Sequence, residues 1–252
     1  MLSLPSPKSI RLIATDMDGT LTRSGKFTAP LLQVLTDLQD AQIPVVIVTG
    51  RSAGWVNAIV SYLPVAAAIA ENGGLFYKAN HPKLELIVSI PEIALHRQKL
   101  AQMFGELQTI VPHIQESADN RFRITDWTFD IGELSEAELQ QLSDRCQQQG
   151  WGFTYSTVQC HILPLEQNKA AGLLQVLRQQ FSDISVDQLI TIGDSPNDES
   201  LFDACFFPHS VGVANIGHYV DRLTHKPIYI TQAEEAEGFC ELARSLLNDV
   251  SI

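Results

Sequence analysis

The sequence predicts an α/β protein whose core is an open, doubly wound parallel β-sheet, interrupted by a small inserted α+β domain. Short apolar runs alternate with helix-like segments in two separated parts of the 252-residue chain. This alternation is typical of parallel sheets covered by helices on both faces. Between the two parts, the order of the elements is different. We therefore expect a core of residues 1–80 and 166–252, and a cap domain of residues 81–165.

The first part of the core predicts three strands and two helices in alternation. The strands are expected where apolar and β-branched residues run together, and the helices where apolar residues recur at helical spacing. The last strand ends at a turn-forming Glu-Asn-Gly-Gly sequence. In chain order, these elements span residues 10–14, 29–39, 43–48, 53–63 and 66–70.

The second part of the core continues the same pattern and ends in a helix. Its last strand is short, and we expect it at an edge of the sheet. In chain order, the predicted elements are a helix at 170–181, a strand at 188–192, a helix at 199–204, strands at 210–213 and 228–230, and a helix at 238–247.

The inserted segment predicts a helix followed by two strands, twice over. The first unit is a helix at 91–110 with paired strands within 121–131. The second is a helix at 135–149, which opens with a Ser135/Glu138 capping box, and two strands within 151–165 that turn at Ser156–Thr157. Four alternating aromatic residues are expected in the core of this domain: Trp127, Phe129, Trp151 and Phe153.

Composition limits the function classes. The formal net charge of −12 opposes binding to nucleic acid and to anionic membrane surfaces. The N-terminal sequence MLSLPSPKSI lacks the apolar run of a signal peptide, and the longest apolar stretch is too short and too interrupted to span a bilayer. We expect a cytoplasmic protein, a monomer or weak homodimer, with buried, reduced thiols at Cys146, Cys160, Cys205 and Cys240.

The stretch ATDMDGTLT places two aspartates, Asp16 and Asp18, directly after the first predicted strand. Two carboxylates so close repel each other and lose hydration, unless a cation or a tight set of hydrogen bonds compensates. A single Asp-x-Asp is more often a turn that closes on its own backbone. Other parts of the sequence are needed to distinguish a turn from a functional site at Asp16 and Asp18.

Three further segments supply chemically useful groups. Thr49-Gly-Arg-Ser52 and Gly193-Asp-Ser-Pro-Asn-Asp198 each follow a predicted strand, and Lys169 begins a predicted helix. Alone, these features are typical of a helix N-cap, a turn and a surface lysine. Together they place carboxylates, a hydroxyl and a lysine at one edge of the sheet, where open α/β proteins build their sites. Such a set can hold Mg²⁺ and a phosphate group, with one carboxylate as nucleophile and another as acid and base.

These four segments, in this order and spacing, resemble the motifs of the haloacid dehalogenase-like hydrolases. The long insertion between the second and third motifs is similar to that of the Cof-type and sucrose-phosphate-phosphatase-like group, which carries an α/β (C2-type) cap there. The segments ENGG and GVANI also resemble that group. The resemblance implies a Rossmann-like core and a Mg²⁺-dependent phosphatase of small phosphorylated metabolites.

The resemblance also implies roles for the acidic residues. Asp16 would be the nucleophile, forming an aspartyl-phosphate, and a ligand of the metal. Asp18 would be the general acid and base and would lend its backbone carbonyl to Mg²⁺. Asp194 would complete the metal site, with Asp198 behind it.

The remaining motif residues would bind the phosphate group. Thr49 and Gly50 would hydrogen-bond the phosphoryl oxygens, and Lys169 would neutralise them. Asn197 would support the acidic loop and the phosphate, and Arg51 is a further candidate for phosphate contact, although an arginine at a helix start is more often solvated.

Other readings of the motifs remain open. A phosphosugar mutase or phosphotransferase of the same superfamily would share both aspartates. A non-catalytic, receiver-like phosphoacceptor would use similar residues, but with the acceptor on a separate strand from the acidic pair and in about half this length. A dehalogenase would not need Asp18, a pump-type ATPase would carry threonine there, and a silent binding protein would have little reason to keep the full acidic set.

A cap over the carboxyl edge of the sheet favours small soluble substrates, such as a sugar phosphate or a phosphoglycolate-like compound. Polar residues of the cap strands would then contact the part of the substrate beyond the phosphate. The candidates are Arg121, Arg123, Asp130 and His161. Alternation alone does not reveal which strand face looks into the site, and for His161 we expect an ordinary position on the strand surface.

Overall fold

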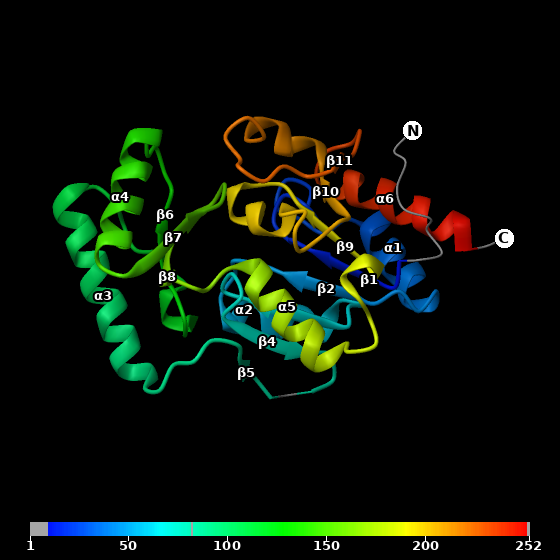
Figure 1. The fold of residues 1–252 in the computed structure, drawn as a ribbon, viewed down its shortest axis with the longest axis horizontal. Helices are drawn as coiled ribbons and strands as arrows, with labels where there is room; N and C mark the ends of the chain where they lie inside the picture. The colour runs from blue at the N-terminus through cyan, green and yellow to red at the C-terminus, as the bar shows by residue number, and fades with distance from the viewer. Residues whose placement is uncertain (1–9, 82, 251–252) are drawn as a thin grey trace.

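Two β-sheets organise the chain (Figure 1). The structure is a computed structural model that describes residues 10–81 and 83–250. An eight-stranded sheet has the order β11-β10-β9-β1-β2-β3-β4-β5, and a separate three-stranded sheet has the order β6-β8-β7. The predicted fold class, a parallel α/β core with a small α+β insertion, is confirmed. The N-terminal sequence at residues 1–9, in which we expect no signal peptide, lies outside the described residues.

The large sheet is parallel from β11 to β3, and β4 and β5 are added antiparallel at one edge. The sequence did not predict these two antiparallel strands. β5 pairs with β4 in the core sheet, so we propose that the cap begins after Leu86, where the sequence analysis expects residue 81. The strands are β1 (Leu12–Thr15), β2 (Val45–Val48), β3 (Ala67–Ala70), β4 (Leu75–Lys78), β5 (Glu85–Leu86), β9 (Leu189–Gly193), β10 (Ser210–Gly212) and β11 (Tyr229–Ile230).

Helices cover both faces of this sheet, which explains why its strands are continuous apolar runs. In β1, Leu12 and Ala14 pack on the side of α5, and Ile13 packs on the side of α1 and α6. The α-helices of the core are α1 (Ala29–Asp40), α2 (Ala53–Tyr62), α5 (Lys169–Gln180) and α6 (Glu235–Val250), and the 3₁₀ helices are η3 (Val186–Gln188), η4 (Pro196–Phe202) and η5 (Ala214–His218). None of the helices within residues 10–81 and 83–250 has the length and apolar character that a membrane crossing requires.

In the smaller sheet, β8 lies between two antiparallel neighbours. Phe129 is fully buried there, and Trp127, Trp151 and Phe153 pack partly buried around it, as predicted. The capping box of α4 is present, because the Ser135 amide donates to Glu138 and the Glu138 amide donates back to Ser135. The elements are α3 (Ile93–Ile110), η2 (Asn120–Phe122), β6 (Trp127–Asp130), α4 (Glu136–Gln148), β7 (Trp151–Tyr155) and β8 (Gln159–Pro164).

The prediction of paired strands within residues 121–131 is wrong, because only β6 forms there. On the open edge of β6, the backbone of residues 115–117 pairs only briefly with it, through an isolated bridge between Glu116 and Phe129. The side chain of Asn120 adds to this pairing: its Nδ2 donates to the Thr128 carbonyl at 2.6 Å, and its Oδ1 accepts from the Thr128 amide at 2.9 Å. This side chain supplies the donor and acceptor that a neighbouring backbone would offer. The cap therefore has three strands instead of four.

Two smaller predictions also need correction. The helix expected at 199–204 is the 3₁₀ helix η4, which begins earlier, at Pro196, because its first turn is tied into the acidic loop by the side chain of Asp198. Cys205 lies exposed in the turn after η4 and is not buried, whereas Cys146, Cys160 and Cys240 are buried; all four cysteines are free.

The helix α5 approaches the turn after β3 so closely that only glycine fits between them. A Cβ atom on Gly172 would lie 2.6 Å from the Cα of Gly73. Backbone atoms on both sides leave no room for relaxation. Gly172 thereby sets the distance between α5 and this turn.

We expect Gly172→Ala to lower the free energy of unfolding by about 1–3 kcal/mol, the usual cost of overpacking, although alanine favours helices. The matched control is Gly105→Ala in the middle of α3, where an added Cβ meets no atom within 4 Å. That change should stabilise the protein by ~1 kcal/mol. Urea unfolding of both variants checks the prediction, and equal shifts of the same sign would contradict it.

Candidate active site

Three buried aspartates meet at the carboxyl end of the central strands. Asp16 follows β1, Asp194 follows β9, and Asp198 lies on η4; these strands are neighbours in the sheet. Each residue offers a carboxylate oxygen, and these three oxygens all lie within 4.8 Å of one another. The structure thus brings together three of the four predicted acidic residues.

Lys169 reaches into this cluster from the first position of α5. Its side chain is fully buried, and its Nζ donates to Asp16 Oδ1 at 2.5 Å and to Asp198 Oδ1 at 2.6 Å. Burial alone would lower the pKa of Lys169, but the two carboxylates outweigh it and hold that pKa well above its ordinary value. The amine is therefore charged, and Lys169 is not a solvated surface residue.

One lysine does not offset three carboxylates. Burial, followed by repulsion from Asp198 and Asp18, raises the pKa of Asp16 to about 7 despite the contact with Lys169. Burial and the other two aspartates also raise the pKa of Asp194 well above its ordinary value. The three carboxylates carry more negative charge than Lys169 offsets, and such a set of oxygen ligands suits a small, hard divalent cation such as Mg²⁺. The residues present therefore fit the predicted metal.

Three residues that the sequence analysis did not single out hold Asp194 in place. Thr20 Oγ1 donates to its Oδ1 at 3.1 Å, and Asn215 Nδ2 donates to its Oδ2 at 2.9 Å. Gly19 has a φ of +81°, and any Cβ there would collide with the Asp194 carboxylate. Thr20 lies inside the DMDGTLT motif and Asn215 inside GVANI, so the motifs contained a signal that points to both.

Both carboxylate oxygens of Asp198 accept hydrogen bonds. Its Oδ1 accepts from Lys169, and its Oδ2 accepts from the amides of Asp194 and Ser195 at 2.9 and 3.1 Å. This carboxylate shapes the loop that carries Asp194 and fixes the lysine. That geometry agrees with its expected place behind Asp194.

Asn197 connects the acidic loop to the turn after β3. Its Oδ1 accepts from Ser195 Oγ at 2.7 Å, and its Nδ2 donates to Asn72 Oδ1 at 3.2 Å. The Nδ2 of Asn72 is buried and has no hydrogen-bond partner in the described chain. The Asn-Gly-Gly turn therefore presents an unpaired donor beside the site, next to Gly50.

Asp18 points to Arg51. Arg51 Nε donates to Asp18 Oδ2 at 2.8 Å, and Nη2 donates to Asp18 Oδ1 at 2.7 Å, a bidentate pair. Arg51 thus belongs to the site, although it contacts a carboxylate here, and its guanidinium also stacks over Trp55. The carboxylate of Asp18 is accordingly absent from the cluster of three.

Thr49 ends β2 and is buried, with Gly50 after it. Its hydroxyl oxygen accepts from the Arg51 amide at 3.1 Å. Ser52, and not Thr49, occupies the N-cap position of α2. Thr49 lines the same small cavity as Asp16 and Asp18.

The cap closes over this cavity, whose volume is about 20 Å³, enough for roughly one water molecule. The cap contributes Ser156, Val158, Gln159 and His161 to its wall. His161 is only 1% exposed, so the expectation of a strand-surface histidine is wrong. The two faces of β8 are both covered, one by the cap helices and the other by the core.

The other cap candidates divide into two groups. Arg123 is buried and its Nη1 donates to the Gly50 carbonyl at 2.9 Å, so it crosses from the cap to the core. Arg121 is exposed and stacks on Phe122, and Asp130 is exposed and accepts from Ser117. These last two candidates lie outside the cavity wall.

Glu71 joins core and cap. It is fully buried, and its carboxylate accepts hydrogen bonds from the Ala53 amide in the core and from the amides of Ile124 and Thr125 in the cap. Burial raises the pKa of Glu71 to about 7, with a further contribution from Asp126, although these donors and Arg123 oppose the shift. The contact between the two domains therefore includes a titratable group.

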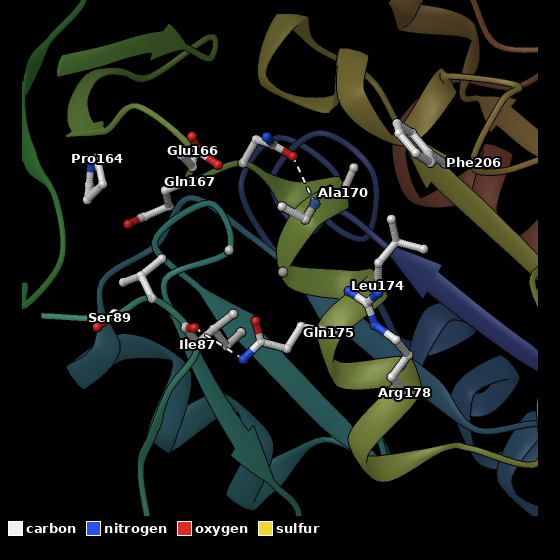
Figure 2. Close-up of a pocket in the computed structure, with 15 residues that line it drawn as sticks. Ile87, Ser89, Pro164, Glu166, Gln167, Ala170, Leu174, Gln175, Arg178 and Phe206 are labelled. Carbon is white, nitrogen blue, oxygen red and sulfur yellow. Dashed lines mark hydrogen bonds between the residues drawn. The ribbon is translucent and has the colours of Figure 1, made fainter. Parts of the chain in front are cut away.

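A larger cavity, about 630 Å³, lies apart from the acidic cluster. Figure 2 shows it between α5 and the two segments that join the sheets, with Gln175 donating to the Ile87 carbonyl at 3.2 Å. None of the carboxylates of the cluster lines it. The smaller cavity is the candidate active site, because Asp16, Asp18 and Thr49 line it.

Comparison with known proteins identifies the family. The family described as Sucrose-6F-phosphate phosphohydrolase matches residues 9–244. The chain belongs to this family. The predicted resemblance to haloacid dehalogenase-like hydrolases is thereby confirmed, and the enzyme is a phosphatase.

Relatives and solved structures cover nearly the whole chain. A phosphoglycolate phosphatase of Methanothrix thermoacetophila is 24% identical over 237 residues, 92% of this chain and 95% of the relative. A haloacid dehalogenase-like hydrolase from Bacteroides thetaiotaomicron has a TM-score of 0.70 at 17% identity, covering 94% of this chain and 99% of that one. The sucrose-phosphatase from Synechocystis sp. PCC6803, solved with sucrose and phosphate, has a TM-score of 0.67 at 17% identity, covering 93% and 97%.

The raised pKa of Glu71 makes stability depend on pH. Between its ordinary pKa of 4.5 and about 7, the folded protein holds a proton that the unfolded chain has lost. The stabilisation is complete below 4.5 and is lost as pH rises through 7, at about 1.4 kcal/mol per pH unit. Glu71→Gln should make the free energy of unfolding less dependent on pH in this range, by the equivalent of about one bound proton. Urea unfolding from pH 5 to 8, at saturating Mg²⁺, measures the slope in both proteins, and parallel curves would refute the assignment.

Proposed function

We propose that this phosphatase hydrolyses small phosphorylated metabolites through an aspartyl-phosphate on Asp16, with Mg²⁺ as cofactor. The observation that supports it most strongly is the contact of Lys169 with Asp16 within a cluster of three buried carboxylates. Lys169 orients Asp16 and favours its ionised form, and the cluster still carries an excess of negative charge that a cation would balance. The phosphatase names of relatives and neighbours point the same way.

In the proposed first step, an oxygen of Asp16 forms a bond to phosphorus while the ester P–O bond breaks. Asp18 gives a proton to the leaving oxygen. In the second step, Asp18 takes a proton from water, whose oxygen attacks phosphorus, so that inorganic phosphate leaves and the Asp16 carboxylate returns. Arg51 occupies both oxygens of Asp18 in the structure, so this role requires the guanidinium to move from Asp18 toward the phosphoryl oxygens.

The other site residues would hold the phosphoryl group. The Thr49 hydroxyl, the Gly50 amide and Lys169 would bind its oxygens, with Asn197 and Asn72 behind them. Asp16, Asp194 and the Asp18 carbonyl would ligate Mg²⁺, and Asp198 would support both the loop and the lysine. Bound Mg²⁺ would offset the charge of the carboxylates and draw electron density from the phosphoryl oxygens.

The size of the cavity and the negative charge of the chain favour small soluble substrates over phosphoproteins or nucleic acid. Free cysteines are usual in the reducing cytoplasm, where we place the enzyme. A receiver-like role is less suitable, because Asp16 and Asp18 both follow one strand. Transfer to a second substrate would differ from hydrolysis only in the acceptor, and a measurement of released phosphate distinguishes the two.

Asp16→Asn should abolish Mg²⁺-dependent release of phosphate from p-nitrophenyl phosphate, by at least ~10³-fold, because an amide is no nucleophile. Circular dichroism should show an intact fold. The control is Asp187→Asn, an exposed aspartate on η3, which should keep wild-type activity. Turnover in Asp16→Asn within tenfold of wild type would exclude the covalent route.

Asp194→Asn should stabilise the metal-free protein and remove its response to Mg²⁺. One buried carboxylate fewer means less repulsion, whereas the metal loses a ligand. Without metal we expect the melting temperature to rise by about 2–4 °C, the shift that ~1 kcal/mol produces in a chain of this size. Thermal unfolding in EDTA and in Mg²⁺ checks both effects. A variant that is stabilised by Mg²⁺ as much as wild type would show that the metal lies elsewhere.

A further inference from the structure

His161 places an imidazole in the wall of the small cavity, opposite the nucleophile. It lies on β8, the middle strand of the cap sheet. Its chain neighbours Cys160 and Ile162 pack into the cap core, so His161 projects from the other face, toward the catalytic core. The residue is 1% exposed, and it lines the cavity together with Asp16 and Thr49.

Asp126 fixes one side of the ring. His161 Nδ1 lies 2.8 Å from Asp126 Oδ2. The negative charge of Asp126 is already balanced, because Arg123 Nη1 lies 3.0 Å from both of its oxygens and both side chains are fully buried. His161 therefore needs no added proton to pair with Asp126. Its Nδ1 carries the hydrogen that is donated to the carboxylate.

The ring is neutral at pH 7. Burial lowers the pKa of His161 below its ordinary value, and the nearby charges of Arg123 and Lys169 add to this, whereas Asp126 opposes it. In a neutral ring with a proton on Nδ1, the other nitrogen, Nε2, can only accept a hydrogen bond. Nε2 has no hydrogen-bond partner among the residues that the structure describes.

Two polar side chains of the cavity wall, Gln159 and Arg51, are already engaged. Gln159 Oε1 accepts from Arg123 at 2.9 Å and its Nε2 donates to Asp119 at 3.2 Å. Arg51 is paired with Asp18. The imidazole also lies directly above the loop proposed to bind phosphate, since a Cβ on Gly50 would lie 3.1 Å from His161 Cε1.

We propose that His161, positioned by Asp126, is a specificity-determining residue whose Nε2 accepts a hydrogen bond from a substrate hydroxyl close to the phosphoester. The inference rests on the proposed function and deepens it by naming the substrate class. A hydroxyl donates to Nε2, whereas a carboxylate at that position has no hydrogen to give and repels the nitrogen lone pair. The substrate is therefore a phosphorylated polyol or sugar rather than a phosphorylated hydroxy acid.

The test compares substrates that differ in the groups next to the phosphoester. The hydroxylated pair is 2-hydroxyethyl phosphate and glycerol 1-phosphate, the alkyl pair is ethyl and propyl phosphate, and phosphoglycolate carries the carboxylate. For the wild-type enzyme we expect kcat/KM about tenfold higher for a hydroxylated ester than for its alkyl counterpart, the effect of one hydrogen bond. Phosphoglycolate should fall below 2-hydroxyethyl phosphate.

Substitutions then locate the effect. In His161→Leu, the ratio of kcat/KM for a hydroxylated ester to kcat/KM for its alkyl counterpart should fall close to one. His161→Gln keeps a hydrogen-bond acceptor and should retain part of the wild-type ratio. The ratio is taken within each variant, so a loss of folded enzyme does not alter it. His113→Leu, an exposed histidine in the loop after α3, should leave the ratio at the wild-type value. ¹⁵N NMR at pH 7 should show a protonated Nδ1 and a bare Nε2 in His161.

The outcomes separate this inference from the proposed function. A wild-type ratio near one, an unchanged ratio in His161→Leu, a protonated Nε2, or a preference for phosphoglycolate would each overturn the role of His161. If p-nitrophenyl phosphate were still hydrolysed in an Asp16-dependent way, the proposed function would stand. Activity that persisted in Asp16→Asn would overturn the proposed function instead.

Discussion

Asp16, Asp194 and Asp198 lie within 4.8 Å of one another in the protein interior, and such a cluster is unstable without positive charge among them. Lys169 provides it, but only because α5 begins where its first side chain enters the cluster. The close packing of Gly172 against Gly73 sets how near α5 lies to the turn after β3. The electrostatics of the site therefore depend on packing, because the backbone contact between Gly172 and Gly73 helps to position the charge of Lys169.

The turn Glu71–Gly74 shows how closely the parts are linked. Glu71 binds the cap, Asn72 binds Asn197 of the acidic loop, and Gly73 packs on α5. Glu71 and Asn72 both have a φ of +52°, a left-handed conformation that costs non-glycine residues about 1 kcal/mol each. The hydrogen bonds of their side chains hold this conformation. One short turn thus positions the lysine helix, the metal-side loop and the cap together.

The sequence predicted well what parallel topology determines. Asp16, Thr49 and Asp194 follow strands whose carboxyl ends meet at one edge, so their proximity follows from the order of strands. It predicted poorly what depends on side-chain direction. Asp18 turns to Arg51, Asn120 hydrogen-bonds to the edge of β6, and His161 is buried because β8 is covered on both faces. Each of these outcomes depends on a partner distant in sequence, which neither alternation nor helical spacing reveals.

Apart from Ile124, which packs against the core cluster, the cap and the core have separate apolar clusters, and much of what joins them near the site is polar. Arg123 donates to the Gly50 carbonyl, and the amides of Ile124 and Thr125 donate to Glu71. Water can replace such hydrogen bonds at small net cost, unlike a buried apolar contact. The segments that join the domains also border the 630 Å³ cavity of Figure 2. Since the cavity at Asp16 holds about one water, the proposed reaction at Asp16 would require the cap to separate from the core, and the polar contacts would make that separation reversible.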